Sequence, residues 1–252
     1  MENTRFDVDH MAQLREIERA RLKRGEPGLR DPVVQLIREL TMGPAAAKAV
    51  ENLRESQARR LFDLKFGDVL DCSTFEQYLD ATGKDSFEPV PMVSAFPATH
   101  IRLFGTQGIT IADGRVAEKV GLKEYLRLVG LAYGGENDTF EPFDPKRAKS
   151  GIRWMIGQDG YRNRNRKPSD CRKTFAPFEV GMDAIEGGAV YAQNPSVIGT
   201  QQDPHYLYLS GSVHRRDRGR YAYLGLFDGK PELRWRWYGV AFPEYGTASR
   251  GE

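Results

Sequence analysis

The sequence is poor in the side chains that most often bind metals or act as nucleophiles. Among its 252 residues there are only two cysteines and four histidines, and no CxxC, HxH or HExxH spacing occurs. A zinc site built from one local motif is therefore excluded, and we expect no bound metal. A disulfide between Cys72 and Cys171 is disfavoured in a reducing compartment.

Phosphate-binding motifs and long apolar runs are also absent. The chain contains no GxxxxGK[ST], no GxGxxG and no GxSxG, which are the motifs of P-loop, dinucleotide-binding and α/β-hydrolase proteins. No apolar run approaches the ~20 residues that a membrane-spanning helix needs. The first ten residues, MENTRFDVDH, lack the apolar core of a signal peptide. We therefore expect a cytoplasmic protein without a membrane partner.

What the chain does contain is the composition of an ordinary globular protein. Hydrophobic residues make up 40% of it, which is too many for a disordered chain. The formal net charge of +2 argues against a protein that binds polyanions over its whole surface. The charge is uneven, however, because residues 151–252 hold 15 Lys and Arg against 11 Asp and Glu. The positive excess therefore lies in the last two fifths of the chain.

The residue pattern predicts an α+β protein in three parts. Residues 1–83 are expected to form a helical N-terminal region, because apolar residues recur at helical spacing and Pro44 precedes three alanines. Residues 84–98 contain three prolines, which predict an extended connector. Residues 99–252 are then expected to form an α+β domain.

Several local patterns predict individual elements. Ser73 and Glu76 form a capping-box pattern, which predicts a short helix that ends at Gly83. Apolar spacing predicts the remaining elements. The expected strands are 99–104, 108–113 and 152–156, and the expected helices are 122–131 and 177–192.

Residues 205–238 have the clearest pattern in the chain. They predict three antiparallel strands, the first two joined by a long basic loop and the last two by a tight turn. Asp228-Gly229 is the dipeptide typical of a two-residue hairpin turn. Pro231 fits the start of the following strand, where a missing N–H costs little.

Alternation in the last of these strands predicts which side chains are buried. Leu233, Trp235 and Trp237 alternate with charged or polar residues, as in a strand with one face on a core. We expect both tryptophans to pack against the helix at 177–192. Arg234 would then lie on the opposite face of the sheet.

Three segments of the last two fifths carry a resemblance to known sequences. They are residues 231–237 (PELRWRW), residues 209–212 (LSGS) before the basic loop, and residues 179–185, expected as a helix between two strands. From about Gly151 onward the chain resembles a family of uncharacterised bacterial proteins known only as a domain of unknown function. The resemblance implies a shared topology and carries over no catalytic residue or cofactor.

Basic residues are the candidate binding site. Arg162, Arg164 and Arg166 alternate, so an extended backbone would place them on one side, where guanidinium groups can hold phosphates in pairs of hydrogen bonds. The loop at 213–220 adds a second basic segment. The alternative is a solvated surface whose arginines pair with acids. The candidate anion-binding residues are Arg162, Arg164, Arg166, Lys167, Arg215, Arg216, Arg234 and Arg236.

We therefore expect a binding module for an anionic partner, either nucleic acid or a phosphate-bearing ligand. The alternative is an enzyme that acts on a small substrate in a cleft between the two regions, with Cys171 and His205 or His214 near a carboxylate. A third possibility is a protein–protein adaptor built on the N-terminal helices. The sequence indicates neither a cofactor nor an oligomeric state, and it leaves open whether the protein is an enzyme.

Overall fold

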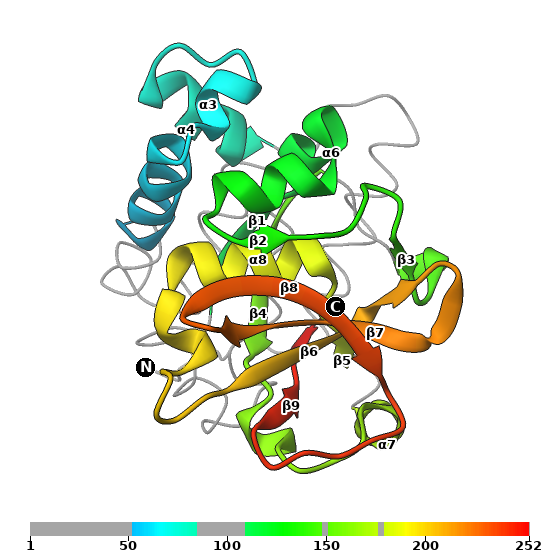
Figure 1. Cartoon of the computed structure of the whole chain (residues 1–252). Helices are drawn as coiled ribbons and strands as arrows, with labels where there is room; N and C mark the ends of the chain where they lie inside the picture. Colours follow the sequence, from blue (N-terminus) through cyan, green and yellow to red (C-terminus); the bar gives the residue numbers. More distant parts are fainter. Residues whose placement is uncertain (1–51, 85–108, 148–150, 176–178, 252) are drawn as a thin grey trace, which may run out of the picture. The chain divides into compact units, whose positions relative to one another are not determined.

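The computed structural model describes residues 52–84, 109–147, 151–175 and 179–251 (Figure 1). Contacts divide the chain into Met1–Ser56 and Gln57–Glu252, and nearly all described residues belong to the second unit. Residues 1–51 of the expected helical region, the expected strand at 99–104 and all of the expected connector at 84–98 except Lys84 lie outside the described residues. The described part confirms an α+β protein, in which helices precede two sheets.

The described chain begins with helical residues 52–63, followed by α3 (Phe66–Val69) and α4 (Phe75–Lys84). The short helix predicted here is confirmed, but its capping residues differ from those predicted. The Gln77 backbone N–H donates to Thr74 Oγ1 at 3.2 Å, and Gln77 Oε1 accepts from the backbone N–H of Ser73 at 2.8 Å. The side-chain amide oxygen of Gln77 thus reaches back to the N–H groups of Ser73 and Thr74, as was predicted for the carboxylate of Glu76.

Four strands form the first sheet, in the order β1-β4-β10-β5, and all pairs are antiparallel. The strands at 108–113 and 152–156 are confirmed as β1 and β4. Strand β10 lies between β4 and β5, far from both in sequence. The bounds are β1 (Ile109–Asp113), β4 (Ile152–Gln158), β5 (Glu179–Gly181) and β10 (Ser249–Gly251).

The second sheet has the order β2-β8-β7-β6-β3, with β9 paired to β6. Its centre is the antiparallel unit of three strands predicted at 205–238. Asp228 and Gly229 both have positive φ, 47° and 75°, as a type I′ hairpin turn requires. The bounds are β2 (Ala132–Tyr133), β3 (Phe140–Pro142), β6 (Tyr206–His214), β7 (Asp217–Phe227), β8 (Lys230–Trp237) and β9 (Tyr245–Thr247).

The prediction of a long basic loop between β6 and β7 is wrong. Only Arg215 and Arg216 join the two strands, because β6 continues to His214 and β7 starts at Asp217. Arg218 and Arg220 are therefore strand residues. Their polarity suggested a loop, but the first residues of β7 are partly or fully exposed, and long charged side chains are tolerated at such positions.

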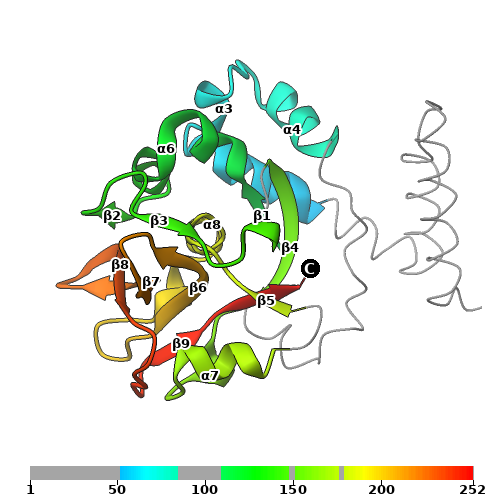
Figure 2. The same ribbon diagram turned by 90° about the vertical axis from the view of Figure 1, so that its right-hand side faces the viewer.

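Two helices pack against the sheets. Helix α6 (Gly114–Leu128) starts directly after β1, earlier than the predicted 122–131, and its Gly121 has a non-helical φ of 82°. Helix α8 (Ala184–Gln193) lies between the two sheets, where Figure 2 shows it end-on. The predicted helix at 177–192 therefore begins seven residues before the observed helix, which starts at Ala184. Residues 179–181 instead form a strand that pairs with β10.

None of the described helices combines the length and apolarity needed to cross a membrane.

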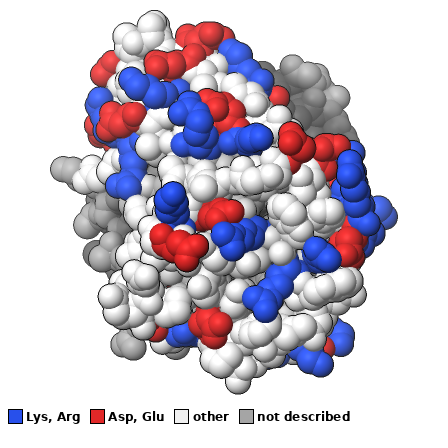
Figure 3. Space-filling view, viewed as in Figure 1, with Lys and Arg blue, Asp and Glu red and all other residues white. Residues whose placement is uncertain are grey.

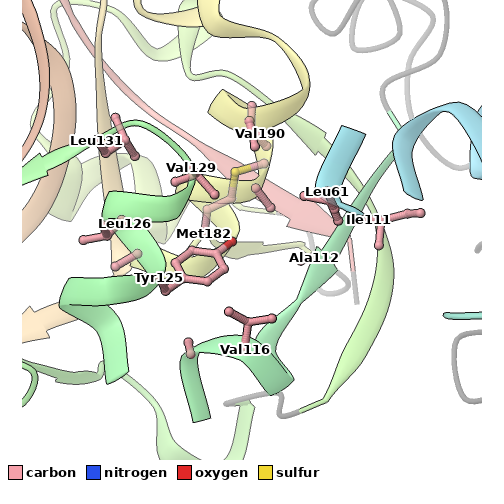
Figure 4. Packing of buried hydrophobic residues seen from close by; sticks show 14 of the residues in the cluster. Leu61, Ile111, Ala112, Val116, Tyr125, Leu126, Val129, Leu131, Met182 and Val190 are labelled. Atoms are coloured by element: carbon pink, nitrogen blue, oxygen red, sulfur yellow. The ribbon is translucent and has the colours of Figure 1, made fainter. Parts of the chain in front are cut away.

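The main core surrounds α8. Figure 4 shows the ring of Tyr125 beside Met182, with Val190 and Leu126 nearby. Helix α8 approaches its neighbours closely, since a Cβ on Gly188 would lie 2.9 Å from a ring carbon of Tyr125. The glycines of α8 thus serve packing, which outweighs their low helix propensity.

The other face of the second sheet carries a separate aromatic core. Its buried members are Tyr208, Val213, Tyr221, Tyr223 and Tyr245. The face of the sheet on which Arg234 was expected to lie therefore contains packed rings. Such rings contribute stability through area burial and ring–ring contacts.

Of the two tryptophans predicted to pack against the helix at 177–192, only Trp235 faces the main core. Trp235 packs against the main core, but its ring neighbours are Phe140 at 6.2 Å and His214 at 5.4 Å between centroids. Trp237 is 52% exposed, and the guanidinium of Arg220 lies 5.1 Å from its ring centroid. Alternation correctly places both side chains on the same face of β8. Trp237 is nevertheless exposed, because it ends the strand, beyond the edge of the core.

Candidate functional site

A pocket of about 200 Å³ lies where α7 (Pro168–Lys173), β5, the start of α8 and the middle of β6 meet. Its wall combines groups of both charges with two phenyl rings. The charged and aromatic lining residues are Asp144, Glu179, Asp183, Glu186, Arg172, Arg250, Phe143 and Phe175.

A β-bulge in β6 shapes one side of this pocket. Leu209 pairs with Ala222 and Val213 pairs with Tyr221, so residues 210–212 have no partner on β7. The bulge instead turns toward β5 and α8, where the Gly211 N–H donates to Met182 O at 2.8 Å. Bulges of this kind re-aim a strand beside functional sites.

Glu186 is the centre of a buried ion cluster behind the pocket. Its side chain is fully buried, with Oε1 2.8 Å from Arg153 Nη2 and also in contact with Arg250 Nε. Burial alone would raise the pKa of Glu186, but the two guanidinium groups hold it below its usual value. Because the arginines come from β4 and β10, the cluster ties the first sheet to α8.

Asp183 is the partly exposed carboxyl of this group. It caps α8, since Oδ1 accepts from the Glu186 N–H at 2.8 Å while Glu186 Oε2 accepts from the Asp183 N–H at 2.8 Å. Burial, and next the negative charge of Glu186, raises the pKa of Asp183 from 3.8 to about 6. A carboxyl that exchanges its proton near neutral pH, in a pocket, is a feature of functional sites.

Changing Asp183 to Asn will alter the pH dependence of stability. The raised pKa means that the folded state binds this proton more tightly than the unfolded state, so Asp183 destabilises the fold while ionised above about pH 6. This cost disappears as the pH falls from 6 toward 4. Over this range, the free energy of unfolding of wild type in urea should rise relative to that of Asp183→Asn by up to ~1.4 kcal/mol for each unit by which the pH falls. Asparagine keeps the cap, and parallel pH profiles for the two proteins would contradict this assignment.

Arg172 is the partly exposed cation of the pocket. Its Nη1 donates to Ser210 O at 2.7 Å, and its Cζ lies 3.5 Å from the ring centroid of Phe143. These contacts fix the plane of the guanidinium. Arg218 also reaches this point, where its Nη2 donates to Phe143 O at 3.3 Å. Arg172 and Arg218, which were not among the candidate anion-binding residues, therefore both contact Phe143 beside the pocket.

The expected common face of Arg162, Arg164 and Arg166 does not form. Arg162 lies in the 3₁₀ helix Tyr161–Asn163, and Asn165 has a left-handed φ of 56°, so the backbone is not extended. Arg162 pairs with Glu179 of the pocket wall. Arg164 donates to Pro243 O at 3.0 Å, and Arg166 donates to Asn163 Oδ1 at 3.3 Å. Lys167 directly precedes α7 and is exposed.

The other candidates lie in the turn between β6 and β7 and along β8. Arg215 is 4.0 Å from Glu141 and from Asp138, and Arg216 is exposed in the turn. The rest contact the aromatic core: Arg234 pairs with Glu232 at 2.8 Å and lies over Phe227, while Arg236 donates to Tyr245 Oη at 3.1 Å. Figure 3 shows blue and red side chains intermixed on the visible face.

The proposed Cys and His catalysts are not among the residues that line the pocket. Cys171 is buried, and burial raises the pKa of its thiol. His205 Nε2 is 2.8 Å from the backbone oxygen of Asp159, and His214 packs between Phe140 and Trp235. Within the described ranges, none of the three has a hydrogen bond to a carboxylate, and no cluster of His, Cys, Asp and Glu suits a metal ion.

The sequence contained two signals for this pocket. Residues 179–185 and 209–212, which carry the family resemblance, are the segments that meet there. In addition, Asp183 followed by Glu186 three residues later is a helix-start pattern, and it marks the end of α8 that faces the pocket. Both signals indicate local structure only. That these segments lie beside one another follows from the fold.

Comparison with known proteins finds no match for this chain among family models, curated proteins or solved structures. The resemblance to a bacterial family of unknown function therefore stays a prediction.

Proposed function

We propose that the protein binds a small molecule carrying an anionic group, in the pocket at the start of α8. The observation that carries this proposal is the fixed guanidinium of Arg172 in the pocket wall. A guanidinium has five donors in one plane, so it can hold Ser210 and a ligand together. Since its plane is already set, little side-chain entropy is lost when a carboxylate or phosphate binds.

Size favours a small molecule over nucleic acid. The pocket volume of about 200 Å³ equals that of about seven waters at ~30 Å³ each. Pockets for drug-sized ligands hold ~300–1,000 Å³, so the part of the ligand that this pocket encloses is smaller than a typical drug. Binding to nucleic acid would need an extended basic surface, whereas Arg162, Arg215 and Arg234 lie beside acids.

Changing Arg172 to Met will weaken anion binding by about 10–100-fold, because a hydrogen bond to a charged group contributes ~1.5–3 kcal/mol. The probes are inorganic phosphate and three six-carbon carboxylates, namely 4-methylpentanoate, 2-hydroxy-4-methylpentanoate and L-leucine, titrated by NMR. Arg216→Gln and Lys167→Gln are controls outside the pocket wall and should bind as wild type. Equal losses in a control, or no saturable binding of any probe to wild type, would contradict the proposal.

Asp183 favours a second candidate function, an enzyme acting on the bound molecule. A carboxyl with a pKa of about 6 can accept a proton at neutral pH and return it, as a general base does. This enzyme would use neither Cys171 nor the histidines. Its test is prolonged incubation with each probe that binds, followed by NMR of the probe. An unchanged probe in every case would argue against it.

A further inference from the structure

We propose that an anion binds in this pocket together with one proton, which the carboxylate of Asp183 takes up from the solvent. The resulting carboxyl group donates a hydrogen bond to the anion that the guanidinium of Arg172 also holds. This inference rests on the proposed function, because it describes how the binding of the same anion depends on pH.

Negative groups are numerous in the wall of the pocket. Among the described residues that line it are four carboxylates and two guanidinium groups. An anion that enters this volume therefore meets repulsion as well as the attraction of Arg172, and both are stronger there than in water. A proton on one carboxylate removes part of the repulsion. The carboxylates belong to Asp144, Glu179, Asp183 and Glu186, and the guanidinium groups belong to Arg172 and Arg250.

Asp183 takes the proton at less cost than its ion-paired neighbour Glu186. Glu186 is fully buried and contacts two arginines, so a proton there would break two buried ion pairs. Asp183 is 24% exposed at its side chain and is also paired, with Arg153 at 3.3 Å. This arginine lies closer to Glu186, at 2.8 Å, and keeps that partner when Asp183 is protonated.

The groups around Asp183 favour its protonated form near neutral pH. Burial, and next the negative charge of Glu186, raises the pKa of Asp183 to about 6, against the attraction of Arg153 and Arg250. Tyr125 of α6 also faces Asp183, and burial raises the pKa of its hydroxyl, which stays uncharged at neutral pH. A bound anion adds another negative charge and raises the pKa of Asp183 further. At pH 7 the bound state therefore holds a proton that the free state has mostly lost.

The helix cap is compatible with a carboxyl group that donates. Oδ1 of Asp183 accepts from the Glu186 N–H at 2.8 Å, while Oδ2 is the atom near Arg153. A proton on Oδ2 leaves the cap at Oδ1 in place and gives the carboxyl group one donor. Oxygens of a carboxylate or phosphate are acceptors, so Asp183 and Arg172 can both donate to one anion.

Calorimetry in two buffers tests this inference. The probe is 2-hydroxy-4-methylpentanoate, titrated at pH 7 into the protein in buffers that differ in their enthalpy of ionisation. The difference between the two heats of binding gives the number of protons taken up, and we expect about one per anion. Linkage then requires that the dissociation constant rise at least about tenfold between pH 6 and pH 8, where the free protein loses this proton.

Two variants assign the proton to one residue. Asp183→Asn keeps the helix cap and has no proton to gain, so its affinity should not change between pH 6 and pH 8. At pH 8 it should bind the probe at least about tenfold more tightly than wild type does. Asp144→Asn removes another carboxylate of the same wall and is the matched control, which should keep the pH dependence of wild type.

The outcomes separate this inference from the proposed function. Saturable binding to wild type without proton uptake would refute the inference and leave the proposed function intact, whereas no saturable binding of this probe or of phosphate at any pH would overturn both. Proton uptake that persists in Asp183→Asn, or that disappears in Asp144→Asn alone, would remove the assignment to Asp183. If Asp183→Asn does not fold, the number of protons taken up by wild type and by Asp144→Asn still decides.

Discussion

Changing Glu186 to Gln will lower the free energy of unfolding by about 3–5 kcal/mol, the usual cost of removing one partner from a buried ion pair. Glu186 is fully buried between Arg153 and Arg250, which are themselves 12% and 5% exposed at their side chains. Without the carboxylate, both buried guanidinium groups lose an ion-pair partner, although Arg153 also contacts Asp183 at 3.3 Å. Urea unfolding monitored by circular dichroism measures the effect.

A matched control is Glu124→Gln, which removes an exposed carboxylate paired with Arg127 at 2.6 Å. This change should have no measurable effect, because exposed pairs contribute little. A triple variant, Arg153→Met, Glu186→Leu and Arg250→Met, should recover much of the stability, since apolar groups can replace a whole buried cluster. If Glu186→Gln lowers the free energy of unfolding as little as the control does, then water reaches the ion cluster.

Changing Gly211 to Ala is expected to cost about 2–3 kcal/mol and to abolish binding in the pocket. A Cβ there would lie 2.5 Å from Gly181 O and 2.8 Å from Met182 O, which are backbone atoms that cannot rotate away. Overpacking in a dense interior usually costs ~1–3 kcal/mol. The bulge would have to move away from β5, and the pocket wall with it. Thermal unfolding and titration with 2-hydroxy-4-methylpentanoate measure the two effects.

Gly134→Ala is the control for this substitution. A Cβ on Gly134 meets no atom within 4 Å, so unfolding and binding should stay as in wild type. If Gly211→Ala unfolds like this control, the bulge has room to shift. If it is destabilised but still binds the same probe as wild type does, the bulge does not form the pocket wall.

The sequence predicted the parts of the fold that depend on local pattern. Apolar spacing predicted β4, and alternation predicted β8, the last of the three strands β6, β7 and β8. The dipeptide at 228–229 predicted the hairpin turn between β7 and β8 with its two positive φ angles. These signals lie within a few residues of one another. They therefore need no knowledge of distant contacts.

The errors arose where a distant segment decides the structure. Residues 179–181 have apolar spacing compatible with a helix, but pairing with β10 makes them a strand. The alternating arginines at 162–166 would share a face only in extended backbone, and a 3₁₀ helix occurs instead. The pocket was missed for the same reason, because Arg172, Asp183 and Arg250 meet only after both sheets have formed.

The position of β10 has a consequence for how the protein is made. Gln158 of β4 and Ser249 of β10 are hydrogen-bonded although they stand 91 residues apart, and Arg250 reaches Glu186 across 64 residues. Until residues 249–251 are synthesised and inserted, β4 and β5 have no partner between them, and Glu186 lacks one of its two arginines. During synthesis the protein is therefore expected to pass through a state with two unpaired strand edges, which are prone to aggregation.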